Sequence, residues 1–202
     1  MPPELWDAYF PLMPADIQAR ISRFTRWEDG HSTLLGRLLL IAGLSEYGYS
    51  QDCLNTISYD SYGRPFFDAD IDFNISHSGR YVVCCITDRG RVGVDIEEIK
   101  PVNVDDFTDQ MTSEQMDNIG RAENAGLQFF KYWTVKESVI KADGRALNIP
   151  LAEITVEGST AKLFNKLWSV MAVGIDGDYE CHVATETESD EICVKEFRAL
   201  DF

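Results

Sequence analysis

The chain has 202 residues, 45% of them apolar and 11% aromatic, so it can fold around one substantial core or two smaller ones. Its 34 acidic residues against 18 basic ones give a net charge of -16, which repels nucleic acid and restricts anionic ligands to local basic pockets. The longest apolar stretch, residues 34–44, is too short to span a bilayer, and residues 1–4 lack the basic region of a signal peptide, so we expect a cytoplasmic protein without a membrane partner.

Two helices followed by strands are predicted in the first half of the chain. A helical pattern runs through residues 14–24, and an apolar stripe predicts a second helix over residues 28–44. Residues 1–13 are rich in proline and show no clean alternation, so no element is predicted there. Strands are predicted at residues 56–59, 66–67, 81–87 and 91–96, and Asp88-Arg89-Gly90 indicates a hairpin between the last two.

The second half repeats this order of helices and then strands. Residues 101–105 have the character of a linker and place a boundary between a lobe of residues 1–101 and a lobe of residues 102–202. Helices are predicted near residues 114–122 and 127–142, and strands at residues 153–157, 167–175, 179–186 and 192–197. The pattern predicts an α+β fold of two similar lobes.

Two acidic side chains share one face of a predicted strand in the segment Gly93-Val94-Asp95-Ile96-Glu97. Residues two apart in a strand point the same way, so Asp95 and Glu97 lie on a common face. The same alternation is typical of a half-buried strand whose polar face is simply solvated. The spacing by itself therefore leaves a structural and a functional interpretation open.

A third carboxylate and a lysine lie on one face of the predicted helix that contains residues 133–141. Glu137 and Lys141 are four residues apart, so one lies above the other, whereas Lys136 points elsewhere. The pair could be an ordinary helix salt bridge. Together with the acidic strand, however, it provides three hard oxygen ligands beside an ammonium, which a magnesium-bound phosphate ester needs.

A polar segment, residues 73–79, contains Ser76 and His77 and is expected to begin as a strand and pass into a turn. A lone histidine in such a place is more often structural. Together with the neighbouring motifs, however, the segment resembles the 4'-phosphopantetheinyl transferases, specifically the larger two-lobed type that modifies carrier proteins of peptide and polyketide synthases. The resemblance extends from about Phe24 to Pro150 and rests on five ordered segments, residues 28–37, 63–66, 73–79, 93–97 and 133–141.

The resemblance implies a pseudo-twofold monomer that binds coenzyme A in the cleft between its lobes. It implies the transfer of 4'-phosphopantetheine from coenzyme A to a serine of an apo acyl or peptidyl carrier protein, with release of adenosine 3',5'-bisphosphate, a reaction of secondary metabolite biosynthesis. Mg²⁺ is the implied cofactor. In phosphoryl transfer of this kind the protein mainly positions the reacting groups and neutralises charge.

The resemblance also assigns roles at the metal and the pyrophosphate. Asp95, Glu97 and Glu137 match the family's metal ligands, and Lys141 matches its pyrophosphate-binding lysine. Glu114 aligns with a glutamate proposed to help deprotonate the acceptor serine, although it could equally be a capping-box residue at the start of a helix. Metal-bound water is another candidate base. Glu97, Glu114, Glu137 and Lys141 are thus the candidate catalytic residues.

The remaining matches concern coenzyme A. Where relatives contact the 3'-phosphate, this chain has Arg20, Thr33 and Arg37. Gly63 and Arg64 match the turn on the adenine side, and Ser76 and His77 match the segment that contacts the adenosine phosphates. Lys136 is a further candidate because it precedes the metal-binding glutamate. The acceptor is expected to dock on an apolar patch with local basic residues, for which Phe107, Met111, Met116 and residues 129–132 are candidates.

Two other functions stay open. One is a coenzyme A binding module that has lost catalysis, which the retained carboxylates and Lys141 disfavour. The other is a metal-dependent phosphoesterase built on the same acidic cluster, which the phosphoadenosine-type positions Ser76 and His77 disfavour. Transfer to an apo carrier protein would separate the first from a transferase, and hydrolysis of coenzyme A without an acceptor would reveal the second.

Overall fold

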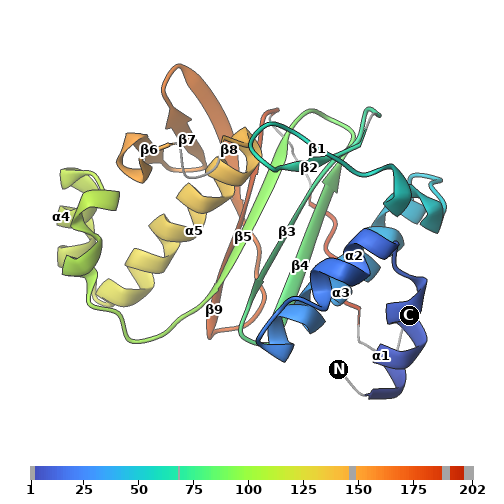
Figure 1. The fold of residues 1–202 in the computed structure, drawn as a ribbon. Coiled ribbons are helices and arrows are strands. Elements are labelled where there is room, and N and C mark those ends of the chain that lie inside the picture. Colours follow the sequence, from blue (N-terminus) through green and yellow to red (C-terminus); the bar gives the residue numbers. More distant parts are fainter. Residues whose placement is uncertain (1–2, 68, 146–148, 188–191, 198–202) are drawn as a thin grey trace.

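The computed structural model describes residues 3–67, 69–145, 149–187 and 192–197. Its fold is α+β and has two halves, each of which packs one helix of 19 residues on antiparallel strands (Figure 1). None of the helices in these ranges is long and apolar enough to cross a membrane.

The N-terminal half is a hairpin of strands covered by helices. Its longest helix, α3, packs on the hairpin β3–β4, and their shared core includes Leu34, Leu40 and Phe73. The hairpin pairs Asp72 with Thr87 at its open end. The elements of this half are α1 (Pro3–Tyr9), α2 (Ala15–Ile21), α3 (Trp27–Ser45), β1 (Ser58–Tyr59), β2 (Pro65–Phe66), β3 (Asp72–Ser78) and β4 (Tyr81–Thr87), with short 3-10 turns at Phe10–Leu12 and Gln51–Thr56.

The C-terminal half is one antiparallel sheet with α5 packed on it. The strand order is β5-β9-β8-β7-β6, and α5 covers β5 and β9 over a core that includes Val139, Leu163 and Trp168. Gly144 ends α5 in the left-handed conformation, with φ of 90°. The elements are β5 (Val92–Glu98), α4 (Ser113–Arg121), α5 (Ala125–Asp143), β6 (Ile154–Glu157), β7 (Thr160–Leu163), β8 (Lys166–Ala172) and β9 (Tyr179–Thr185), with 3-10 turns at Val104–Gln110 and Leu151–Glu153.

The two halves meet where β3 runs beside β5 (Figure 1). The contact is made by side chains: Asp72 Oδ2 accepts from the amide of Val92 (2.8 Å), Asn74 Oδ1 from Val94 (3.0 Å), and Ser78 Oγ from Glu98 (3.0 Å). The constant spacing of these pairs shows that the strands are parallel. We call this contact, formed by residues 72, 74, 76 and 78 of β3 against β5, the seam.

The four predicted helices all lie where the sequence predicts them, but the central strands pair differently from the prediction. The predicted hairpin of residues 81–87 and 91–96 is wrong, because β4 pairs with β3 and β5 pairs with β9. The loop at Gly90, whose φ is 83°, carries the chain from one sheet to the other. Local turn signals fix that short connection, but they do not decide which strands share hydrogen bonds.

Several smaller expectations also differ. Ser76 and His77 lie within β3, since the strand continues to Ser78 and the turn falls at Gly79, whose φ is 52°. Residues 3–9 form a helix where none was predicted, and β7 was not predicted. Residues 192–197 form no strand.

The boundary of the lobes at residue 101 remains a prediction. In the structure β5, which precedes that boundary, is hydrogen-bonded along its length to β9, from Val92 opposite Thr185 to Glu98 opposite Tyr179. The acidic strand therefore belongs to the sheet that carries α5, and it contacts the other half through the seam, through β4 and through Arg64.

Candidate active site

Strand β5 presents two carboxylates to the helix α5. Asp95 and Glu97 lie on the face that α5 covers, and Asp95 is only 3% exposed. The helix approaches this closely because Gly93 has no side chain: a Cβ there would overlap with the backbone of Ser138 and Ala142. The close approach brings groups on α5 within hydrogen-bond distance of the strand.

Successive turns of α5 contribute Trp133, Glu137 and Lys141, which line the same pocket. The ammonium of Lys141 donates to Asp95 Oδ1 at 2.5 Å and to Ser76 Oγ at 2.9 Å. A residue from β3, one from β5 and one from α5 thus meet at one point. The predicted grouping of Glu137 and Lys141 on one helical face is confirmed.

Serines of the seam hold both carboxylates of β5. Ser76 Oγ donates to Asp95 Oδ1 at 3.1 Å, and Ser78 Oγ donates to Glu97 Oε2 at 3.0 Å. The pocket that they border has a volume of about 390 Å³ and is lined by residues from both halves, which are Ile75, Ser76, His77, Asp95, Glu97, Trp133, Glu137 and Lys141. Six of the sequence-predicted site residues therefore lie around one pocket.

The carboxylates of the pocket carry a surplus of negative charge. Burial raises the pKa of Asp95, although its ion pair with Lys141 opposes the rise. Burial also raises the pKa of Glu97 and of Glu137, and the charge of Asp95 raises both further. A single ammonium does not neutralise three carboxylates, so a bound cation would stabilise this arrangement.

The residues present fit a divalent metal ion. Within the described ranges no three acidic, histidine or cysteine side chains converge as a ready-made metal site, and Lys141 occupies one oxygen of Asp95. The other oxygen, Asp95 Oδ2, is buried and accepts no hydrogen bond from any described residue. An orphaned carboxylate oxygen beside Glu97 and Glu137 suits a hard cation such as Mg²⁺.

A second group of polar side chains lies on the N-terminal half around Arg37 of α3. The Arg37 side chain is 6% exposed, and its buried Nη1 has no partner among the described residues. Burial lowers the pKa of Arg37, Tyr59 opposes this, and the neighbouring charge of Arg20 lowers it again. Two neighbouring cations, one of which has an unused buried donor, suit an anion. Thr33, one turn before Arg37, donates its hydroxyl to Asp29 O at 2.8 Å.

Four further predicted residues lie away from both the pocket and the Arg37 group, and they are Lys136, Glu114, Arg64 and Gly63. Lys136 is fully buried and donates to the carbonyls of Gln110 (2.8 Å) and Leu151 (3.0 Å), and burial lowers its pKa to about 8. Glu114 lies on the exposed first turn of α4, where the capping box is formed by Thr112 and Gln115 rather than by the glutamate.

The third of these residues is Arg64. Its guanidinium is buried between β3, β5 and the end of α5, where it binds Asp72. The preceding Gly63 adopts a φ of 81° in an exposed turn closed by Asp60, and no atom lies within 4 Å of a Cβ built there. The turn therefore leaves open space on the side where the resemblance implies adenine.

Sequence reasoning did not assign roles to Ile75, Ser78 and Trp133. Trp133 was quoted as part of the helix motif, and its position four residues before Glu137 is the signal that places it on the pocket face. Its side chain lowers the pKa of Glu97 and so opposes the effect of burial on that carboxyl. The role of Ser78 depends on β3 lying beside β5, which no local pattern indicates.

Comparisons with known proteins agree with this geometry. Residues 91–188 match a family described as the 4'-phosphopantetheinyl transferase superfamily, and residues 2–88 match one described as 4'-phosphopantetheinyl transferase, N-terminal. The α+β fold and the shared pocket thus define a two-part transferase-like protein. The chain belongs to the 4'-phosphopantetheinyl transferase superfamily.

Individual relatives cover much of the chain. A 4'-phosphopantetheinyl transferase of Bacillus subtilis is 33% identical over 156 residues, which are 74% of this chain and 68% of the relative. The 4'-phosphopantetheinyl transferase Sfp of Bacillus subtilis strain 168 is 30% identical over 154 residues, with the same two shares. The crystal structure of Thermotoga maritima holo-[acyl-carrier-protein] synthase aligns with 46% of this chain and 61% of its own at 13% identity, with a TM-score of 0.41.

Proposed function

We propose that this member of the superfamily transfers 4'-phosphopantetheine from coenzyme A to a serine of an apo acyl or peptidyl carrier protein in a Mg²⁺-dependent reaction. The observation that carries the proposal is the meeting of Asp95, Glu137 and Lys141 with Ser76 and His77 around one pocket between the halves. The serine oxygen forms a bond to the phosphorus that carries pantetheine. The bond from that phosphorus to the bridging oxygen breaks, and adenosine 3',5'-bisphosphate leaves.

Each proposed role follows from where the side chain lies. Asp95, Glu97 and Glu137 would hold Mg²⁺, which when bound neutralises charge on the pyrophosphate oxygens. The ammonium of Lys141 stabilises the departing phosphate, since it lies beside Asp95 and Ser76. Glu114 stays a candidate base for the serine proton if the acceptor approaches along α4.

The arginine group of the N-terminal half would take the 3'-phosphate. Arg37 and Arg20 repel each other in the protein alone, and Arg37 has an unused buried donor, so a phosphate placed there relieves both costs. Ser76 at the seam and His77 beside it on β3 would contact the phosphates, and the turn at Gly63 would receive the adenine.

Burial excludes some of the residues proposed for the surface on which the carrier protein docks. Met111, Phe129 and Phe130 belong to a core cluster and are at most 9% exposed, so they are not free to contact a carrier protein. Phe107 and Met116 are only partly buried against that cluster and remain the proposed apolar contacts.

Mass spectrometry of an apo carrier protein incubated with the enzyme, coenzyme A and Mg²⁺ tests the proposal. We expect the carrier to gain one phosphopantetheine group, and Asp95→Ala and Glu137→Ala to abolish the gain while remaining folded. Arg89→Met, which changes an exposed side chain on the β4–β5 loop, is the matched control. Hydrolysis of coenzyme A without any acceptor would support a phosphoesterase instead, and binding without transfer would support an inactive binding module.

A further inference from the structure

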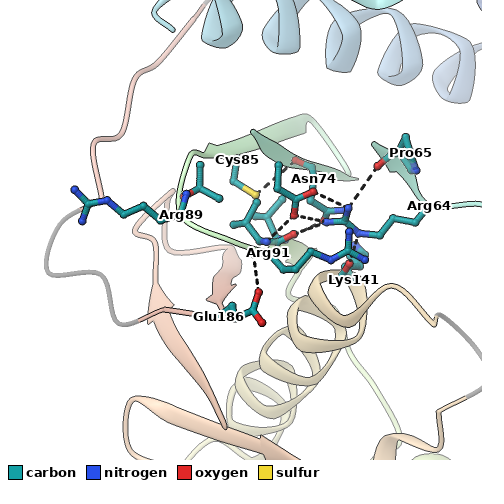
Figure 2. A network of polar contacts seen from close by, with 12 residues as sticks. Arg64, Pro65, Asn74, Cys85, Arg89, Arg91, Lys141 and Glu186 are labelled. Atoms are coloured by element: carbon teal, nitrogen blue, oxygen red, sulfur yellow. Dashed lines mark hydrogen bonds and ion pairs between the residues drawn. The ribbon is translucent and has the colours of Figure 1, made fainter. Parts of the chain in front are cut away.

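The guanidinium of Arg64 uses all of its donors within the protein. It forms a fork with Asp72, with Nη1–Oδ1 and Nη2–Oδ2 both at 2.7 Å. Nε donates to the carbonyl of Lys141 (3.0 Å), Nη2 also to Val92 (2.9 Å), and Nη1 also to Pro65 (3.4 Å). Figure 2 shows Arg64 reaching past Pro65 toward the backbone of Lys141. An arginine has five N–H donors, so none remains for a ligand.

These contacts join three elements of the candidate active site. Asp72 begins β3, and its Oδ2 also accepts from the amide of Val92 at 2.8 Å. Val92 begins β5, the strand that carries Asp95. Lys141 lies in the last turn of α5, where carbonyls lack partners within the helix and a cation is favoured. One buried ion pair thus fixes the ends of two strands and one helix relative to each other.

The burial of this pair argues for a geometric role. Arg64 is 7% exposed and Asp72 is 8% exposed. The desolvation of two such ions usually offsets their attraction, so an apolar pair of similar size would stabilise the fold about as well. An apolar pair, however, could not donate to the carbonyls of Lys141 and Val92. What the ion pair adds over apolar packing is therefore the fixed placement of α5 and β5.

We propose that Arg64 and Asp72 are positioning residues, which hold α5 and β5 so that the ammonium of Lys141 reaches Asp95 and Ser76 across the seam. Arg64 does not bind coenzyme A through its side chain, contrary to its assignment from the resemblance. This inference rests on the proposed function for the reaction that the placement serves, but the placement itself can be measured without that reaction.

The first test separates positioning from coenzyme binding. We expect Arg64→Met and Arg64→Lys to lower kcat by about 10- to 100-fold, the usual effect of misplacing a reacting group by about 1 Å, while the Kd of coenzyme A stays within about twofold. Assays run well below the melting temperature of each variant. A Kd raised about tenfold or more with unchanged kcat would make Arg64 a coenzyme ligand and overturn the inference.

The second test separates positioning from simple stability. The double variant Arg64→Met with Asp72→Leu removes both charges and is expected to recover much of the melting temperature that Arg64→Met loses. Its kcat should stay low, because the carbonyls of Lys141 and Val92 still lack their donor. Recovery of kcat together with the melting temperature would show that the pair serves stability alone.

Amide hydrogen exchange gives a readout that does not depend on turnover. Exchange in the last turn of α5 and at the start of β5 should accelerate in Arg64→Met and in the double variant, but not in Arg89→Met. If the wild-type protein showed no transfer, the proposed function would fail, but hydrogen exchange would still show whether Arg64 holds α5 and β5 in place. Unchanged exchange in both Arg64 variants would contradict it.

Discussion

Lys141 connects the chemistry of the pocket to its scaffold through two different groups of one residue. Its ammonium binds Asp95 and Ser76, and its carbonyl accepts from Arg64. The side chain is 28% exposed, so a ligand in the pocket can contact it without unfolding the site. The charge of this lysine should therefore matter most when negative charge builds on a departing phosphate.

The variant Lys141→Met tests this role. We expect the transfer rate to fall more than the affinity for coenzyme A, because methionine keeps the apolar stem and removes only the charge. Stability should fall by roughly 1 to 3 kcal/mol, since Asp95 is left buried without its partner. Arg89→Met, which changes an exposed side chain outside the pocket lining, is again the control. Unchanged turnover of folded Lys141→Met at saturating coenzyme A would leave the lysine only a structural role.

Arg37 is expected to discriminate coenzyme A from dephospho-coenzyme A. Arg37→Ala should weaken coenzyme A by about 1.5 to 3 kcal/mol and dephospho-coenzyme A much less, because the lost charge-assisted bond is to the 3'-phosphate. Titration calorimetry with both ligands measures the difference, and Arg26→Ala on the exposed turn before α3 is the control. Equal weakening of both ligands would move Arg37 out of this role. The same pair of ligands tests Arg20.

Because His182 is buried, we expect the folded protein to lose stability in mild acid. Burial lowers its pKa from 6.5 to about 4, and the charge of Lys131 contributes. The unfolded chain therefore takes up a proton that the folded protein does not, so stability is present above pH 6.5 and is lost as the pH falls toward 4. The ring lies 2.7 Å from Thr134 Oγ1, a contact that asparagine can imitate.

Urea unfolding of wild type and His182→Asn at neutral pH and near pH 4.5 measures this effect. The wild type should lose more free energy of unfolding between the two pH values than the variant does, because the variant lacks the titrating group. Equal losses would mean that His182 is not the group responsible.

At the scale of elements, α5 and β5 owe their contact to a missing side chain. Gly93 allows the backbone of α5 to approach β5 closely enough for Lys141 to reach Asp95. The periodicity of the sequence was enough to predict both elements and the shared faces of Asp95 with Glu97 and of Glu137 with Lys141. It could not predict that these faces meet, because the close packing depends on two segments far apart in the chain.

Two glycine substitutions, with opposite expected effects on stability, test the close approach of α5 to β5. Gly93→Ala should destabilise the protein by about 1 to 3 kcal/mol and lower the transfer rate, because the new methyl group pushes α5 away. Gly120→Ala in α4, where no atom lies within 4 Å of the added Cβ, should stabilise by roughly 0.5 to 1 kcal/mol. Destabilisation by Gly120→Ala, or none by Gly93→Ala, would contradict this account.

For the whole molecule, the sequence was sufficient to predict the fold class and six of the eight residues around the pocket, but not how the halves join. The seam depends on polar side chains along the whole of β3, whereas the sequence predicts that this segment begins as a strand and passes into a turn before Gly79. Likewise, Arg64 and Lys136 read as ligand-binding cations, because a sequence motif does not reveal that backbone carbonyls already occupy their donors.

Arg64, paired with Asp72 of the seam, also donates to Val92 and Lys141 of the other half, so we expect the halves to unfold together. The variant with Trp6→Phe and Trp27→Phe keeps Trp133 and Trp168, so its tryptophan fluorescence reports only on the C-terminal half. Circular dichroism of the same variant reports on the helices of both halves. The two urea midpoints should coincide. In Asn74→Leu, which leaves the amide of Val94 without its partner, both midpoints should fall together, and the free energy of unfolding should fall by about 1 to 3 kcal/mol. Separate midpoints in the protein without the Asn74 change would show that the halves are independent.

A junction made by side chains is specific in a way that a backbone ladder is not. Two strands joined through their main chains can slip by two residues and recover the same bonds and the same faces. Here such a slip would set Asn74 where Asp72 now accepts from Val92, and would take Arg64 away from the carbonyls of Val92 and Lys141 to which it donates. The side chains of the seam therefore allow only one register between the two halves, and that register sets the distances between the residues that line the pocket.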